Sequence, residues 1–219
     1  MEFFVADIFN EVDEDVRKAK SLALWKSYGK YVIAGAVLIV AGTASYVGWQ
    51  NYTKSQSAAQ STRFEAAAAM VTDKKLAGAA TEFSALATDG NAGYRPLSLL
   101  REAAALLDAG NGAEALEVYS ALGSDGSVDP EFSSLAHLLA GYYLLDNGST
   151  DDVRSRVEPI MQAGSIWNAS ANELVALSYL KDGNGAKARE VLLALQEDAS
   201  TPADVKERVT QLLAAIGDS

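Results

Sequence analysis

One stretch of the chain is apolar and carries no charge. It runs from Tyr31 to Trp49, reads YVIAGAVLIVAGTASYVGW and is 19 residues long. A helix rises about 1.5 Å per residue, so this stretch is long enough to cross most of a hydrocarbon core of ~30 Å. Aromatic residues stand at both ends, as expected of side chains at the two headgroup levels of a bilayer: Trp25, Tyr28, Tyr31, Tyr46, Trp49 and Tyr52. The pattern predicts one transmembrane helix over residues 31–49.

Two other interpretations of this stretch fit less well. A cleaved signal peptide would have a shorter apolar region and a shorter segment before it than residues 1–30. A buried helix of a soluble protein seldom stays free of charge over this length. We therefore expect an uncleaved anchor that contacts the lipid bilayer.

The basic residues near the two ends of the span predict its orientation. Five precede it (Arg17, Lys18, Lys20, Lys26, Lys30), whereas two follow it before Lys74 (Lys54, Arg63). Because Lys and Arg accumulate on the cytoplasmic side, we expect residues 1–30 in the cytoplasm. The C-terminal part would then be exported, and in a bacterium it would lie in the periplasm, attached to the inner membrane.

The cytoplasmic arm has its own apolar periodicity. Val5, Ile8, Phe9, Val12, Val16 and Ala19 follow the i, i+3, i+4, i+7 spacing, which predicts an amphipathic helix. Such a helix either lies on the membrane surface or docks a partner. Within the span, Gly35, Gly42, Ser45 and Gly48 fall near one helical face. Small faces let another membrane helix approach closely, so these four residues are a candidate helix-contact face, although small residues are common in membrane spans.

Three short segments in the rest of the chain repeat one another. They are LLDAGNG at 106–112, LLDNGST at 144–150 and YLKDGNG at 179–185, with offsets of 38 and 35 residues. A period near 34 with two helices per unit is typical of tetratricopeptide-type repeats. Small residues would let the paired helices cross closely, at Ala67/Ala79, Ala103/Ala115, Gly141/Val153 and Ala176/Ala188. Each second member is followed at fixed spacing by two larger residues, at Phe83/Leu86, Tyr119/Leu122, Val157/Ile160 and Leu192/Leu195.

This small–small–aromatic spacing resembles the tetratricopeptide consensus, without its Trp and most of its closing prolines. The fold class expected is all-α: a single N-terminal transmembrane helix, then an α-solenoid of about four helical hairpins and a C-terminal capping helix. The expected helices are 56–71 and 75–87, 94–109 and 113–122, 131–146 and 151–163, 168–181 and 185–197, and a cap over 202–216 that begins at Thr201-Pro202. Residues 50–61 would be a helical stalk or short linker, and residues 62–219 the repeat domain.

Composition excludes several kinds of chemistry. The net charge of −11 argues against nucleic-acid binding. The absence of Cys removes disulfides, thiolate metal sites and Cys nucleophiles. The single histidine, His137, lies in the apolar run LAHLLAGYY, where a structural role is the better interpretation. No catalytic motif occurs, so we expect no enzyme activity, metal or cofactor.

Tetratricopeptide arrays resemble one another in binding along the inner face of each first helix. Carried over by register, that face implies a partner-binding groove at Leu100, Leu107, Leu138, Tyr142, Leu145, Leu177 and Leu180. The groove would be apolar with an acidic edge, and it lacks the basic clamp for a peptide carboxylate. It would suit apolar protein segments, although leucines at helical spacing can equally pack between neighbouring units.

The whole layout resembles the ancillary subunit of the bacterial SecYEG translocon. The acidic arm DIFNEVDEDVRKAK and the span YGKYVIAGAVLIVAGTASYVGWQNY carry the resemblance. It implies a non-catalytic scaffold whose partners are translocon subunits, a membrane-anchored periplasmic chaperone of the prolyl-isomerase type and exported polypeptides. The alternative is an accessory or assembly subunit of another inner-membrane complex, respiratory or in cell division.

Overall fold

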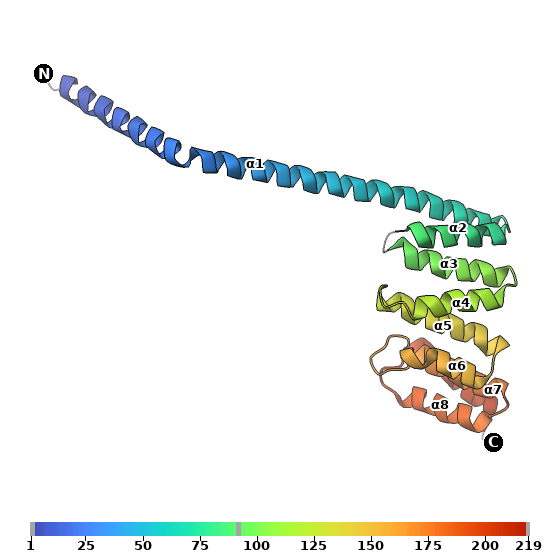
Figure 1. Ribbon diagram of the computed structural model, residues 1–219. Coiled ribbons are helices and arrows are strands. Elements are labelled where there is room, and N and C mark those ends of the chain that lie inside the picture. Colours follow the sequence, from blue (N-terminus) through green and yellow to red (C-terminus); the bar gives the residue numbers. More distant parts are fainter. Residues whose placement is uncertain (1–2, 91–92, 218–219) are drawn as a thin grey trace. The chain divides into compact units, whose positions relative to one another are not determined.

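The described part of the chain is helical throughout. The computed structural model describes residues 3–90 and 93–217, and within these residues helices occur and no strands (Figure 1). This confirms the predicted all-α fold, in which one long apolar N-terminal helix precedes an array of helical hairpins. The chain divides into two compact units, Met1–Ala58 and Ala59–Ser219.

The first helix, α1, spans Phe3–Thr72 and includes the whole predicted transmembrane segment. The predicted stalk, residues 50–61, is therefore helical. Between Lys20 and Thr72 the helix is long and apolar enough to cross a membrane, and none of its most apolar window is buried in the chain. These properties are compatible with a single-pass anchor. The backbone of residues 5–19 is helical. The side chains of the apolar stripe predicted there lie outside the described residues.

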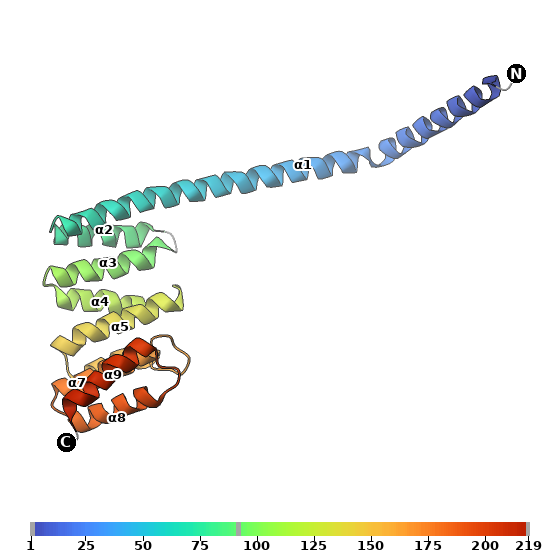
Figure 2. The same cartoon turned by 180° about the vertical axis from the view of Figure 1, so that it is seen from behind.

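The second unit is a stack of helices joined by short connections. Figures 1 and 2 show α2 to α8 following one another along the stack, with α9 beside α7 and α8. The helices after α1 are α2 (Leu76–Asp89), α3 (Tyr94–Asp108), α4 (Gly112–Gly123), α5 (Pro130–Asn147), α6 (Thr150–Val157), the short 3₁₀ helix η1 (Glu158–Ile160), α7 (Asn168–Lys181), α8 (Gly185–Glu197) and α9 (Ala203–Ile216).

The repeat template of small and larger residues forms the core of this stack. All sixteen template positions are buried. Gly141 shows how close the helices approach, because a Cβ added there would lie 2.7 Å from both Leu174 and Val157. In the first repeat, the last turns of α1 pack on α2, with the rings of Phe64 and Phe83 edge to face at 5.2 Å. The spacing read from the sequence is therefore the spacing of the helix crossings.

The first helices of the hairpins form a layer of their own. α3 contacts α5, α5 contacts α7, and α7 contacts α9, in addition to the contacts within hairpins. The described second helices α2, α4, α6 and α8 make no such contacts with one another. The layer of first helices is thus the more closely packed one, as expected for the concave side of a curved two-layer solenoid. The capping helix α9 extends this layer.

The repeated Gly-Asn segments end the first helices through left-handed residues. Gly110 and Gly183 have φ angles of 85° and 74°, a region in which a Cβ is costly. The following amide bonds back to the helix, from Asn111 N to Leu106 O at 2.8 Å and from Asn184 N to Tyr179 O at 2.8 Å. These are Schellman turns.

Two of the predicted helix boundaries were wrong. The helix predicted over 151–163 ends as α6 at Val157 and continues only as η1. The cause is Pro159, which lacks the backbone N–H that would bond to the carbonyl oxygen one turn earlier. The predicted cap at Thr201 is also wrong: Pro202 is the N-cap of α9, and the hydroxyl of Thr201 is buried.

One glycine at the start of a second helix leaves room for an aromatic ring. A Cβ added at Gly112 would lie 2.4 Å from the ring of Tyr143 on α5. At Gly185, the equivalent position of α8, the nearest atom would be Cγ2 of Ile216 at 3.5 Å, an ordinary contact. Gly112 and Gly185, which occupy equivalent positions in two repeats, therefore differ in what surrounds them.

Candidate protein-binding surface

The candidate surface lies on the layer of first helices where α5, α7 and α9 are neighbours. Its most exposed large apolar side chain is Tyr142 of α5, which is 44% exposed. Leu177 and Leu180 of α7 are half-buried. Because neighbouring helices α5 and α7 both contribute to it, this part of the layer can present a shared surface to a protein partner. We call the face formed by Tyr142, Leu177 and Leu180 the inner face.

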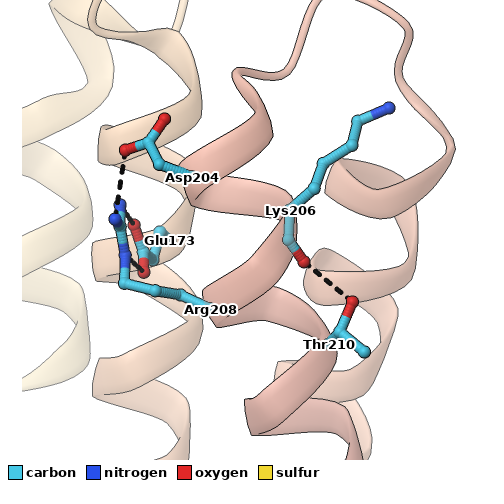
Figure 3. Close-up of polar contacts among 5 residues, drawn as sticks. All are labelled: Glu173, Asp204, Lys206, Arg208 and Thr210. Atoms are coloured by element: carbon cyan, nitrogen blue, oxygen red, sulfur yellow. Dashed lines mark hydrogen bonds and ion pairs between the residues drawn. The ribbon is translucent and has the colours of Figure 1, made fainter.

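An ion pair joins α7 to the capping helix at this face. Glu173 is 5% exposed and accepts two hydrogen bonds from Arg208, from Nε at 2.7 Å and from Nη2 at 2.8 Å. Arg208 also donates from Nη1 to Asp204 at 3.2 Å. Figure 3 shows the guanidinium between the two carboxylates. A bidentate, charge-assisted pair is among the strongest polar contacts in proteins, so it orients α9 against α7.

Tyr142 lies close enough to Glu173 and Arg208 for their charges to affect its pKa. Partial burial raises the pKa of the Tyr142 hydroxyl, and the negative charge of Glu173 raises it further, while Arg208 opposes the increase. The hydroxyl thus remains protonated and able to donate a hydrogen bond at neutral pH. An exposed aromatic ring with a polar tip is the kind of residue that protein interfaces favour.

A second set of polar contacts joins the ends of α5 and α7. The Nζ of Lys181 donates to the carbonyl oxygens of Leu145 at 2.6 Å and Asp146 at 3.0 Å. These carbonyls end α5 without a helical partner, so the ammonium satisfies them and complements the negative end of the helix dipole. Nearby, the hydroxyl of Thr150 donates to Asp182 at 2.6 Å. The last two hairpins are therefore held together by polar contacts as well as by their apolar core.

The seven residues predicted to line the groove are not equally accessible. Tyr142, Leu177 and Leu180 make up the inner face as defined above. Leu100 and Leu107 of α3 pack partly buried against the first core cluster, and Leu145 of α5 packs against the second. Leu138 is 5% exposed and belongs to that second cluster, because it points between hairpins, so it offers almost no surface to a partner.

The predicted helix-contact face in α1 is open in the described structure. A Cβ added at Gly35, Gly42 or Gly48 would meet no atom within 4 Å, and Ser45 is exposed. Room for another helix therefore exists at these positions.

His137 has a structural position between hairpins. It is half-buried on α5, and its Nε2 lies 3.1 Å from the carbonyl oxygen of Gly123 at the end of α4. Burial lowers the pKa of His137, and the positive charge of Arg156 on α6 lowers it further. The ring is therefore neutral near pH 7 and donates to Gly123.

Sequence reasoning missed the role of Arg208. A signal was present: Glu173 and Arg208 are 35 residues apart, the offset between the last two repeated segments. The same offset separates Asp146 from Lys181, where the ammonium bonds the backbone carbonyl oxygen of Asp146. Residues one repeat apart lie at matching positions on neighbouring first helices, so the period itself predicts polar contacts between them.

Comparison with known proteins gives one match that covers most of the chain. A family model described as a tetratricopeptide repeat-like domain matches residues 23–214. No curated protein and no solved structure matches. Among the described residues, no group of three His, Asp or Glu side chains could hold a metal ion.

Proposed function

The chain belongs to the tetratricopeptide repeat-like family, and from that premise we propose that it is a membrane-anchored scaffold for protein–protein contacts without catalysis of its own. Domains of this family are generally non-catalytic scaffolds that mediate protein–protein interactions. The observation that carries the proposal is the pairing of a long unburied helix, free of charge over residues 31–49, with a repeat array that presents Tyr142 at 44% exposure.

The charges around the span support an orientation with the N-terminus in the cytoplasm. Residues 16–64 contain seven Lys and Arg and no Asp or Glu, and five of the seven precede Tyr31. Residues 65–219 carry 23 Asp and Glu against 11 Lys and Arg. Since basic flanks stay on the cytoplasmic side, the acidic array would be exported, into the periplasm of a bacterium.

The orientation can be tested with single cysteines, because the chain has none of its own. Ser21 and Gln211 are exposed and lie in the two units. In spheroplasts, a membrane-impermeant maleimide should label Gln211→Cys at once and Ser21→Cys only after the membrane is permeabilised. The reverse pattern would refute the orientation, and release of the chain by alkaline carbonate would refute the anchor.

The resemblance to the ancillary SecYEG subunit names the proposed partners. In this role the scaffold would sit beside the translocon through α1 and pass exported chains to a membrane-anchored periplasmic chaperone. The open face at Gly35, Gly42 and Gly48 gives α1 room for a neighbouring membrane helix. The inner face gives the array an apolar surface with a hydrogen-bond donor at Tyr142.

A pull-down from native membranes in mild detergent distinguishes this role from a subunit role. The translocon role predicts translocon subunits together with many exported chains at low occupancy. One partner at fixed stoichiometry, without translocon subunits, would instead make the chain an accessory subunit of that partner's complex. Either result leaves the scaffold assignment in place and decides between the two kinds of partner.

A further inference from the structure

A groove runs along one edge of the array, on residues that do not belong to the inner face. Its central cavity has a volume of about 690 Å³ and lies between the α6–α7 connection and the α8–α9 connection. Its apolar lining is Met161, Ile166 and Ala169 on one wall and Pro202 on the other, and Ser165 and Asp198 are among its polar residues. Both connections join a second helix to the next first helix, so the cavity lies at the edge where hairpins succeed one another.

Two smaller hollows share lining residues with this cavity. One of about 240 Å³ shares Asn168 and Asp198 and adds Glu190 and Val191. The other, of about 380 Å³, shares Met161 and adds Glu158. The shared residues place the three hollows next to one another, and a row of adjacent hollows suits an extended chain better than a compact small molecule.

The wall of the groove is a well-held loop that exposes an apolar residue. Ile166 is 69% exposed, the most exposed large apolar side chain of the described array. On either side of it the loop is tied down: Asn168 Nδ2 donates to Met161 O at 2.6 Å, and Trp167 Nε1 donates to Glu131 at 3.2 Å. Because Ile166 lines the cavity beside Met161 and Ala169, its exposed side chain can serve as an apolar anchor for a partner.

The charge along the groove is mainly negative. Glu158, Glu190 and Asp198 line it, against Arg154 at one end. Hydrogen bonds from the side chain and backbone of Ser200 hold the pKa of Asp198 below its ordinary range, so this carboxylate is charged at neutral pH. Lys206 of α9 lies near enough to Asp198 to contribute to the same effect. The surplus of carboxylates favours a basic partner by charge complementarity.

We propose that this edge groove binds an extended segment of a protein partner in which apolar and basic residues alternate. The apolar side chains would contact Ile166 and Met161 of the α6–α7 connection, and the basic ones would face Asp198 and Glu190 across the groove, since successive side chains of an extended segment point to opposite sides. The proposal rests on the scaffold function proposed above and adds a second surface with its own partner chemistry.

The test uses the full chain in nanodiscs of zwitterionic lipid and a short fluorescein-labelled peptide of alternating valine and lysine. Anisotropy titrations give the Kd, and empty nanodiscs give the background from lipid partitioning. Ile166→Ser should weaken binding about fivefold or more, and Asp198→Asn about two- to fivefold. Asn keeps the oxygen that accepts from Ser200, so the loop stays closed. A peptide with glutamate in place of lysine should bind no better than background.

Leu193→Ser is the matched control, because Leu193 is an exposed leucine of α8, at 39%, outside the lining of the three hollows. It should leave the Kd unchanged. The proposal is overturned if Ile166→Ser and Asp198→Asn bind like wild type, or if no peptide binds above background. If Tyr142→Ala alone abolishes binding, the inner face takes the peptide: the scaffold function survives and the edge groove is rejected.

Discussion

Three first helices of the array end in the same turn, but one carries a lysine where the others carry glycine. Lys74 has a φ angle of 62°, close to those of Gly110 and Gly183, and it is the only non-glycine residue with positive φ in the described chain. Its turn closes like the others, with Lys75 N bonded to Met70 O at 2.9 Å. A side chain in this conformation costs roughly 1–2 kcal/mol, so position 74 is under strain that glycine would relieve.

Lys74→Gly should therefore raise the free energy of unfolding of the array by about 1 kcal/mol, after the greater freedom of glycine in the unfolded chain is subtracted. Gly110→Ala and Gly183→Ala should lower it by about the same amount. Lys74→Ala is the control, because it removes the charge but keeps the strained conformation, and it should change little.

Urea unfolding followed by tryptophan fluorescence measures these differences. Trp167 lies in the array, whereas Trp25 and Trp49 lie in α1, so replacing the latter two by phenylalanine leaves one reporter. A change of 1 kcal/mol shifts the midpoint by roughly 0.3–1 M urea at the slopes usual for small domains. If Lys74→Ala stabilised as much as Lys74→Gly, the lysine charge rather than the backbone would be the cause. An unchanged midpoint for Lys74→Gly would refute the strain argument.

Three further predictions concern packing, charge and pH. Gly112→Ala should lower the free energy of unfolding by about 1 kcal/mol because its methyl group displaces the ring of Tyr143. Gly185→Ala should lower the free energy of unfolding by less, or raise it. The same urea assay compares the two variants. Arg208→Ala should cost about 2 kcal/mol because it leaves the buried carboxylate of Glu173 unpaired, and Arg208→Lys should recover only part of this in thermal melts, since lysine lacks the bidentate fork. Folding lowers the pKa of His137 from its usual 6.5, so the unfolded chain binds protons more readily. The free energy of unfolding should therefore fall as the pH drops below that value. His137→Gln should reduce this loss, as measured by thermal melts at pH 7.5 and 5.5.

The helix crossings were predictable because they depend on local spacing. Two helices that cross closely need a small residue on each. The length of the turn and the position of the crossing on each helix set the twelve-residue separation of Ala103 and Ala115. Both are fully buried. The left-handed glycines also have a local signal, since Gly-Asn after an apolar run is a common way to end a helix.

Features that depend on single residues or on connections were harder to predict. Pro159 interrupts an apolar pattern that otherwise continues, so periodicity alone extended the helix too far. The groove residues were chosen by register, which cannot tell Tyr142, facing outward, from Leu138, packed between hairpins. The edge groove is lined by connections such as residues 161–167. The lengths of these connections vary between repeats, so the helical periodicity of the sequence does not predict the groove.

The central claim is that the chain is a scaffold anchored beside the translocon, and site-specific photo-crosslinking in native membranes tests it most directly. Crosslinkers at Gly42 in the span and at Tyr142 and Leu180 on the inner face report on the two contacts separately. The account predicts translocon subunits from Gly42 and many exported chains from Tyr142 and Leu180. One dominant partner from all three positions, with no translocon subunit among the products, would contradict it.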